Sequence, residues 1–332
     1  MNDPKNPPSP AGAYRGRFAP SPTGPLHAGS LVAALGSWLD AKKNGGKWLL
    51  RIEDVDGPRS IPGADLEIMR QLLACGLQWD EEVTWQSECQ EDYQRALEAL
   101  NQHKCLYPCI CSRQTIANAL ATQGIDIPRN QEMVYPENCR PIELRINNLS
   151  ASKVAWRLAL PSNLVIEFED RWLGTQKQQL NQAVGDFVLR RSDGLFAYQL
   201  AVVVDDAAQG ITHIVRGEDL LSNTARQIYL QTVLAYDRPQ YLHLPLVLDE
   251  HGEKLSKQTL ATKIDTQDTK SVLQELQKAA AHLGLSNLPN GENISIAEWL
   301  LAATHAWGNQ SNQKIYNNLT KLSRLFFLKA TQ

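Results

Sequence analysis

Residues 14–30 read YRGRFAPSPTGPLHAGS, and this stretch predicts a strand, a tight turn and the start of a helix. It opens with strand-like residues, continues through three prolines that exclude regular structure, and ends where apolar residues of helical spacing begin. His27 is therefore expected at a helix N-terminus, where free backbone N–H groups and the helix dipole favour an anionic phosphate. Gly24 and Gly29 allow a ligand to approach the backbone closely.

A second motif, KLSK, places Lys254 and Lys257 in a polar loop after the strand-like segment 244–248. Two mobile lysines beside Gly252 suit a pyrophosphate whose charge grows during a reaction. A loop with two lysines is by itself typical of a solvated surface, and a lone histidine after a turn is little more specific. Their joint occurrence, in this order, indicates a site that activates a carboxylate with ATP.

Three further segments lie between the motifs: LLRIEDVD, FAYQLAVVVDD and IVRGEDLL. With them, the two motifs resemble the signature sequences of class I aminoacyl-tRNA synthetases, and the residues in and around the motifs resemble those of the glutamyl branch. The resemblance covers roughly residues 14–260. One departure is Ser30, which stands where many class I enzymes carry a second histidine, so only His27 is carried over as the imidazole near the phosphates.

The resemblance implies an ATP-dependent ligase whose substrates are L-glutamate, ATP with Mg²⁺, and tRNA. His27 and Lys257 would be catalytic, because they would lie nearest the negative charge that develops when pyrophosphate leaves. Gly29 and Lys254 would join them in binding ATP.

Alternating strand and helix patterns predict an α/β fold, a Rossmann-like nucleotide-binding domain with a parallel sheet. The expected strands include 15–19, 47–52, 196–204 and 211–215. We expect a disordered leader (1–13), two halves of the catalytic domain (14–104 and 181–262), an inserted zinc-containing acceptor-binding domain (105–180) and a helical region like a stem-contact domain (263–332). Only 75 residues follow Lys257, which leaves no room for the anticodon-binding domain of full-length glutamyl enzymes.

The 332 residues carry a net charge of −3 and include no apolar run near the ~20 residues that span a bilayer. We therefore expect a cytoplasmic monomer that makes no membrane contact. The overall charge argues against a nucleic-acid binder, but the C-terminal segment is basic, which suits phosphate contacts or a merely solubilising helix face. The basic residues are Lys314, Lys321, Arg324 and Lys329.

Cys109, Cys111 and Cys139 have a spacing that indicates metal ligation in a reducing compartment. Zinc prefers four ligands, and thiolate-rich closed sites are structural, so one position remains to be filled. A subgroup of shortened glutamyl-synthetase-like proteins holds zinc with three cysteines and one tyrosine, and the resemblance to it implies Tyr135 as the fourth ligand. Glu137 or water are the alternatives. The other three cysteines are expected to pack as small hydrophobic residues.

Recognition of free glutamate requires groups for one ammonium and two carboxylates. Arg17, Glu53 and Arg216 all lie at the carboxyl ends of expected strands, which face the ligand cleft in such folds. An arginine pairs bidentately with a carboxylate, so Arg17 or Arg216 is expected to bind the side-chain carboxylate and Glu53 the ammonium.

The resemblance adds Ala19, Ser21 and Tyr198 to the glutamate site. For Tyr198 the alternative is core packing, and for Arg216 it is an ion pair with a neighbouring acid, Glu218 or Asp219. Asp205 and Asp206 would either bind magnesium or cap a turn.

The short C-terminal region and the Cys-x-Cys…Tyr-x-x-x-Cys cluster favour the shortened subgroup. Its members activate glutamate without tRNA and transfer it to the modified base queuosine in the anticodon of tRNA(Asp). Three alternatives remain: a truncated glutamyl-tRNA synthetase acting on a tRNA 3′ end, a small-molecule nucleotidylyltransferase, and a non-catalytic zinc-stabilised RNA-binding module.

Overall fold

The computed structural model describes residues 13–125, 133–144, 149, 153–247, 262–291 and 293–309. Lys254 and Lys257 of the second motif lie outside the described residues. So do residues 1–12 of the expected leader and the basic residues Lys314, Lys321, Arg324 and Lys329.

Two groups of strands form the centre of the molecule, and both are largely parallel. One has the order β1-β2-β3 and the other the order β7-β6-β10-β9, in which only the β6–β7 pair is antiparallel. The Thr212 N–H donates to the Arg15 carbonyl at 3.0 Å, so the two groups meet where β9 runs beside β1. The predicted α/β class with a parallel sheet is confirmed. These strands are β1 (Arg15–Phe18), β2 (Lys47–Ile52), β3 (Thr84–Trp85), β6 (Val165–Asp170), β7 (Gly174–Gln179), β9 (His213–Gly217) and β10 (Gln240–Leu244).

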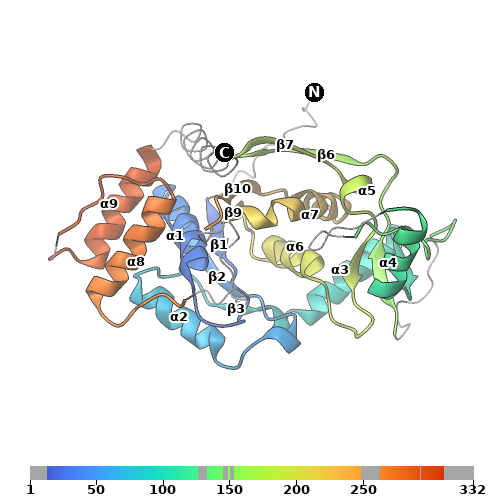
Figure 1. Cartoon of the computed structure of the whole chain (residues 1–332), viewed down its shortest axis with the longest axis horizontal. Coiled ribbons are helices and arrows are strands. Elements are labelled where there is room, and N and C mark those ends of the chain that lie inside the picture. Colours follow the sequence, from blue (N-terminus) through green and yellow to red (C-terminus); the bar gives the residue numbers. More distant parts are fainter. Residues whose placement is uncertain are drawn as a thin grey trace, which may run out of the picture.

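Helices surround this sheet and extend the molecule at one end. Helices α8 and α9 lie at one end of the long axis and α4 at the other, with β1, β2, β9 and β10 between them (Figure 1). Among the described residues, no helix is both long and apolar enough to cross a membrane. The helices are α1 (Ala28–Lys43), α2 (Ala64–Ala74), α3 (Gln90–Gln102), α4 (Arg113–Thr122), α5 (Leu180–Ala183), α6 (Tyr198–Ala208), α7 (Leu221–Val233), α8 (Thr269–His282) and α9 (Ile296–Asn309), with short 3₁₀ turns η1 (Gly57–Arg59), η2 (Gln86–Glu88) and η3 (Glu218–Leu220).

Two expected strands are wrong. Residues 196–204 were expected to be extended, but helix α6 begins at Tyr198 and runs to Ala208. Residues 200–206 of this helix are all buried, so its apolar run cannot be told from that of a buried strand by periodicity alone. The strand expected at 244–248 lies earlier in the chain, because β10 spans Gln240–Leu244 and ends where the expected strand begins.

A third sheet is antiparallel and lies toward α4. It consists of β4 (Leu106–Cys109), β5 (Ala155–Leu158) and β8 (Phe187–Arg190), in the order β4-β5-β8. The β6–β7 hairpin falls between β5 and β8 in the chain, yet β6 pairs with β10 of the central sheet. The division into domains stays a prediction.

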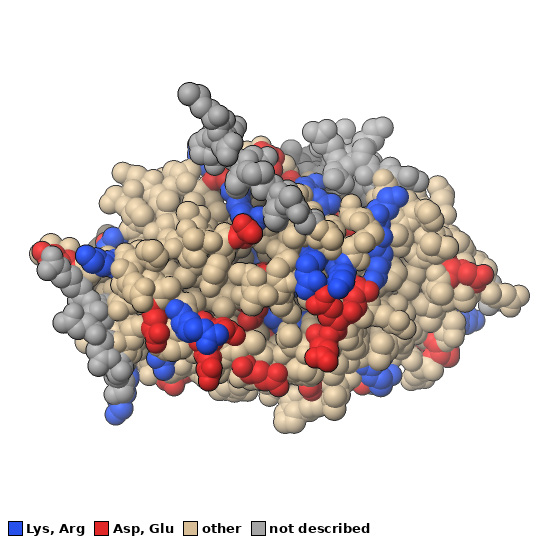
Figure 2. Space-filling view, turned by 180° about the vertical axis from the view of Figure 1, so that it is seen from behind, with Lys and Arg blue, Asp and Glu red and all other residues tan. Residues whose placement is uncertain are grey.

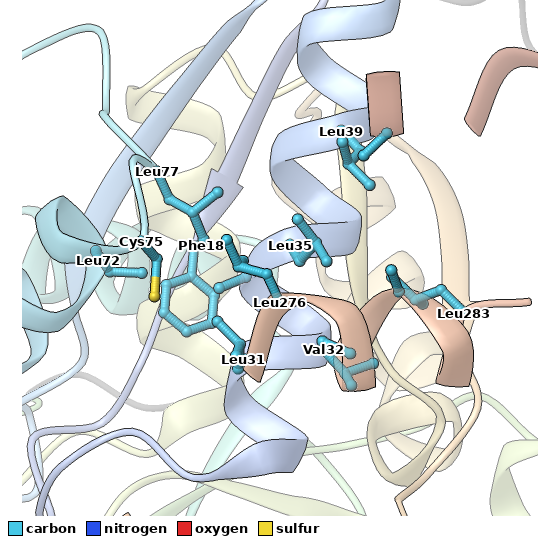
Figure 3. Close-up of a cluster of buried hydrophobic side chains, with 14 of the residues drawn as sticks. Phe18, Leu31, Val32, Leu35, Leu39, Leu72, Cys75, Leu77, Leu276 and Leu283 are labelled. Atoms are coloured by element: carbon cyan, nitrogen blue, oxygen red, sulfur yellow. The ribbon is translucent and has the colours of Figure 1, made fainter. Parts of the chain in front are cut away.

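The largest hydrophobic cluster holds helix α1 in place from several sides. Figure 3 shows Leu31, Leu35 and Leu39 of α1 pointing into a cluster that also contains Leu276 of α8 and Leu72 of α2. Each of these leucines is fully buried or nearly so, and burying one contributes about 1.5–3 kcal/mol. The N-terminus of α1, where the first motif ends, is therefore rigidly positioned.

Candidate active site

A cavity of about 270 Å³ opens at the carboxyl ends of β1, β2 and β9. It brings together every predicted glutamate or ATP residue that the structure describes. These residues are Arg17, Ala19, Ser21, His27, Gly29, Glu53, Tyr198 and Arg216. Their individual roles stay predictions, but segments far apart in the chain reach one concave site, as a substrate cleft requires.

His27 is the N-cap of α1, as the first motif predicts. Its Nδ1 accepts the Gly29 N–H at 3.1 Å and the Ser30 N–H at 3.3 Å. The Ser30 hydroxyl in turn accepts the His27 backbone N–H at 2.7 Å, which completes a capping box. Ser30, the departure from the class I pattern, thus helps to fix the imidazole at the positive end of the helix.

The chain on either side of the second motif reaches this cavity. Val247 lines the cavity, and Lys263 forms a β-bridge with His27. The Ile264 N–H also donates to the Leu26 carbonyl at 3.0 Å. The described residues that flank 248–261 therefore lie at the first motif, although Lys254 and Lys257 themselves are not described.

Arg17 is buried and already paired. Its Nε lies 3.0 Å from Asp206 Oδ1, and a second nitrogen lies 3.4 Å from Asp206 Oδ2. Arg51, also buried, lies 2.9 Å from the same Asp206 Oδ1. Two arginines therefore share one carboxylate beneath the cavity.

Glu53 lies just beyond β2, next to this network, with its side chain only 8% exposed. Burial raises the pKa of Glu53 to about 7, against the opposing effect of Arg51 and Arg17. Glu53 contacts Arg51 at 3.4 Å, but the two arginines of this network face three acids, so the positive charge of an incoming ammonium group would restore the balance.

Arg216 lies on β9 and is held differently. Its guanidinium donates to His243 Nε2 at 3.1 Å, Gln227 Oε1 at 2.8 Å and Thr224 Oγ1 at 2.7 Å. In the described part of the chain, each of its hydrogen bonds goes to a neutral acceptor. The alternative of an ion pair with Glu218 or Asp219 is therefore not observed.

Tyr198, the first residue of α6, both packs in the core and lines the cavity. It packs against a hydrophobic cluster that includes Phe196 and Leu200. Burial raises the pKa of its hydroxyl, and the nearby Glu53 carboxylate adds to this effect. The residue is thus a neutral hydrogen-bonding group on the cavity wall.

Asp205 and Asp206 do not fit a magnesium site. Asp206 pairs with Arg17 and Arg51, whereas Asp205 accepts hydrogen bonds from Tyr93 at 2.9 Å and Gln86 at 2.7 Å. They lie on a helix rather than at a strand end, so the turn-capping alternative is also wrong.

A second cavity of about 500 Å³ shares Ala19, Ser21, Glu53, Tyr198 and Leu220 with the first. It extends toward Asp56, Arg59, Arg191, Phe196 and Asn223. Arg59 and Arg191 both contact Asp56, at 2.6 and 3.5 Å. The site therefore continues from the amino-acid pocket to a surface that carries arginines.

The three predicted cysteines cluster as expected. The Sγ atoms of Cys109, Cys111 and Cys139 lie within 4.8 Å of one another. The Tyr135 hydroxyl lies 3.4 Å from Cys109 Sγ and 3.6 Å from Cys111 Sγ. Zinc–sulfur bonds of about 2.3 Å place tetrahedral ligands about 3.8 Å apart, so this donor set fits zinc. Glu137 instead pairs with Arg140 at 3.1 Å.

Three residues of the site were missed from the sequence: Arg51, Asp170 and His243. Arg51 and His243 each interrupt an apolar strand, and a buried polar residue in such a strand is an unusual feature that marks it for attention. Asp170 was hidden because its segment was assigned to the inserted domain.

Comparisons with known proteins agree with this geometry. The family described as "tRNA synthetases class I (E and Q), catalytic domain" matches residues 13–298. The glutamyl-Q tRNA(Asp) synthetase of Burkholderia cenocepacia (strain HI2424) is 52% identical over 302 residues, which are 90% of this chain and 97% of that protein. The protein of that name from Cupriavidus metallidurans is 51% identical over 89% of this chain and 91% of its own length.

Among solved structures, a glutamate tRNA ligase from Elizabethkingia meningosepticum, in complex with its amino acid, is 28% identical with a TM-score of 0.68. The match covers 87% of this chain and 64% of that one, so this chain spans less than two thirds of the ligase's length. The chain therefore belongs to the class I tRNA synthetases for glutamate and glutamine, a family of ATP-dependent ligases, and to the branch that includes the glutamyl-Q tRNA(Asp) synthetases.

Proposed function

We propose that this chain activates L-glutamate with ATP in the absence of tRNA and transfers it to queuosine in the anticodon of tRNA(Asp). The observation that carries the proposal is one cavity lined by Glu53, a buried acid in a network where acids outnumber arginines, and by Arg216, which has no carboxylate partner among the described residues. These opposite charges match the ammonium and the side-chain carboxylate of glutamate. The names of the relatives support queuosine and tRNA(Asp).

In the first step, an oxygen of the glutamate α-carboxylate attacks the α-phosphorus of ATP, and Mg²⁺-bound pyrophosphate leaves. His27 and Gly29, at the N-terminus of α1, suit the phosphates, and Lys254 and Lys257 would stabilise the leaving group. In the second step, a hydroxyl of the acceptor attacks the glutamyl carbonyl and AMP leaves. Catalysis is then mostly positioning and charge stabilisation, with no covalent enzyme intermediate.

The second cavity suits the acceptor nucleoside, since it adjoins the amino-acid pocket and opens beside Arg59 and Arg191. These side chains are 75% and 46% exposed, so RNA phosphates could reach them in competition with their ion pairs to Asp56 and, for Arg191, to Asp193. On the face shown in Figure 2, basic side chains lie next to acidic ones rather than forming one continuous basic surface. On this face, an anticodon arm would therefore be held by a few local contacts. We propose a cytoplasmic monomer with the domain boundaries predicted above.

We also propose one structural Zn²⁺, held by Cys109, Cys111, Cys139 and the Tyr135 oxygen. Without a metal ion, burial raises the pKa of Tyr135, so the zinc itself would have to stabilise a phenolate; the guanidinium of Arg157, 3.7 Å from the centre of the Tyr135 ring, would add its positive charge. Bound zinc would cross-link β4 to the segment that follows Tyr135. It would stabilise this end of the molecule without taking part in the reaction.

The test is ATP–pyrophosphate exchange with glutamate in the absence of tRNA, followed by transfer of labelled glutamate. We expect exchange by the wild type and a loss of about 10²-fold or more in Lys257→Ala, the scale of one transition-state charge contact. Label should reach tRNA(Asp) carrying queuosine and not tRNA(Asp) lacking it. Label at the 3′ end of tRNA(Glu) would establish an ordinary glutamyl-tRNA synthetase instead.

Elemental analysis of protein never exposed to chelator tests the zinc. We expect about one zinc per chain in the wild type and in Cys105→Ser, whose thiol lies outside the cluster. Cys139→Ser should lose metal and thermal stability together, because metal binding is coupled to folding. Wild type with well under one zinc per chain would contradict the assignment.

A further inference from the structure

Arg216 is oriented by a chain of buried polar groups that no step of the proposed reaction uses. His243 on β10 is fully buried, and Asp170 at the end of β6 is nearly so. The distances along this chain are short: 2.6 Å from Asp170 Oδ2 to His243 Nδ1, and 3.1 Å from His243 Nε2 to Arg216 Nε. The chain thus leads from a carboxylate through an imidazole to the predicted glutamate-binding arginine.

Asp170 determines which imidazole nitrogen carries the proton. Its Oδ1 accepts the backbone N–H groups of Trp172 and Leu173 at 2.9 Å each and that of His243 at 3.3 Å. Its Oδ2 is left for the side chain of His243, whose Nδ1–H must donate to it. Burial lowers the pKa of His243, against the opposing effect of Asp170, which favours a neutral ring. Nε2 is then an acceptor that faces Arg216.

The other partners of Arg216 are also neutral and are themselves held. Gln227 accepts from Arg216 and donates its own amide to Gln199 at 3.1 Å, and Gln199 donates to Asn223 at 2.6 Å. The ring of Tyr241 lies 5.5 Å from the guanidinium carbon and is stacked on His243. The arginine is therefore fixed in direction while its charge has no carboxylate partner in the described part of the chain.

We propose that Asp170 and His243 are positioning residues for amino-acid specificity: they hold Arg216 through a neutral acceptor, so that the side-chain carboxylate of the substrate becomes its counter-ion. This inference rests on the proposed function. A carboxylate placed directly on Arg216 would hold it as firmly but would compete with the substrate. The imidazole of His243 transmits the orienting effect of Asp170 to Arg216. It also keeps the negative charge of Asp170 out of contact with the Arg216 guanidinium.

Asp170→Asn tests this role by reversing the imidazole tautomer. Because three backbone N–H groups point at the Oδ1 position, the amide oxygen must lie there, and the amide NH₂ then faces His243 Nδ1. The ring must accept at Nδ1 and carry its proton on Nε2, where it meets the Arg216 N–H donor. The acceptor for that proton is then Thr224 Oγ1, 3.1 Å from Nε2, which already accepts from Arg216 at 2.7 Å. We expect the KM for glutamate to rise at least 10-fold and the preference over glutamine to fall by a similar factor, with the KM for ATP changed less than 2-fold.

The matched background is His243→Leu, which removes the imidazole through which Asp170 would act on Arg216. We expect this variant by itself to raise the KM for glutamate at least 10-fold. Asp170→Asn should then cost less than 3-fold when added to it, against at least 10-fold in the wild-type background. A merely structural Asp170 would cost the same factor in both backgrounds, and that result would overturn the proposal.

Nitrogen-15 NMR of histidine-labelled protein reads the tautomer independently of activity. We expect the His243 proton on Nδ1 in wild type and on Nε2 in Asp170→Asn; wild type with the proton on Nε2 would overturn the proposal even if the variant fails to fold. A reversed tautomer with unchanged KM for glutamate would also overturn it. A wild type that shows no glutamate-dependent exchange would instead refute the proposed function.

Discussion

Arg17 and Arg216 line the same cavity and are about equally buried, at 3% and 4% exposed, yet their surroundings are opposite. Around Arg17, two arginines and three acids form an ionic network with Asp206 at its centre. Around Arg216, hydroxyl, amide, imidazole and carbonyl groups supply every hydrogen bond recorded in the described residues. We therefore expect Arg17 to act mainly in stability and Arg216 to keep its charge for a ligand.

Of the substitutions that test this contrast, replacing Arg216 is expected to have the largest effect on activity. Arg216→Gln should lower kcat/KM for glutamate-dependent pyrophosphate exchange by about 10³-fold or more, since the carboxylate of the substrate would be buried without a counter-ion. Unfolding in urea should change by only about 1 kcal/mol, because the former partners are neutral. Arg95→Gln, on the exposed face of α3, is the control and should match wild type in both measurements.

Replacing Arg17 should affect stability first. Arg17→Gln leaves Asp206 with Arg51 as its remaining charged partner in a buried site, and breaking such a pair costs about 3 kcal/mol. Urea unfolding measures this loss. If Arg17→Gln were as stable as wild type but inactive, the division of labour between the two arginines would be reversed.

The preference for glutamate over glutamine tests whether the charge of Arg216 is free to pair with the substrate. The wild type should activate glutamate at least about 10²-fold better than glutamine, because a neutral amide leaves a buried guanidinium poorly compensated. In Arg216→Gln the ratio should fall toward one. Exchange rates with both amino acids at equal concentration provide the measurement, and equal rates in the wild type would refute the assignment of Arg216.

Glu53 gives the smallest effect and a test of pH. Its pKa is about 7 in the folded chain against 4.5 as the reference value, so the folded state holds the proton more tightly in this range. The stability that its protonated form contributes is complete below pH 4.5 and is lost as the pH rises through 7. Glu53→Gln should therefore be more stable than wild type at pH 8, by about 1–3 kcal/mol, and similar at pH 5.

Urea unfolding at both pH values checks this prediction, and glutamate binding provides the contrast. The more stable variant should bind glutamate less tightly, because the ammonium loses its counter-ion. A stability gain that is equal at pH 5 and pH 8 would show that the buried charge of Glu53 is not its cause.

The sequence predicted which residues meet because the carboxyl ends of parallel strands face one cleft. That rule brought Arg17, Glu53 and Arg216 together, and the strand-turn-helix layout placed His27 correctly at the start of α1. The rule says nothing about partners across layers. The contrast between the arginines depends on Asp206 in a helix mistaken for a strand, and on His243, whose partner Asp170 lies in a segment assigned to another domain.

The cysteine cluster was predictable for a different reason. Cys109 and Cys111 are close in sequence and Tyr135 is four residues from Cys139, so local spacing carries much of the information. Tyr135 and Cys139 had to lie next to the first pair despite the long interval, and they do: the Tyr135 hydroxyl accepts the Cys139 N–H at 2.9 Å and lies 3.4 Å from Cys109 Sγ.

Tyr198 lines the amino-acid cavity, the cavity that leads to Arg59 and Arg191, and a third cavity of about 300 Å³ beside Arg157 and Arg226. The side chain of Tyr198 thus forms part of the wall of three cavities. Ligands in adjacent cavities can then be thermodynamically linked through this ring. If a ligand in one cavity shifts the ring and changes the affinity for a ligand in the next cavity, the second ligand changes the affinity for the first by the same factor. The order in which glutamate and its acceptor arrive would alter the route to the ternary complex but not its total free energy.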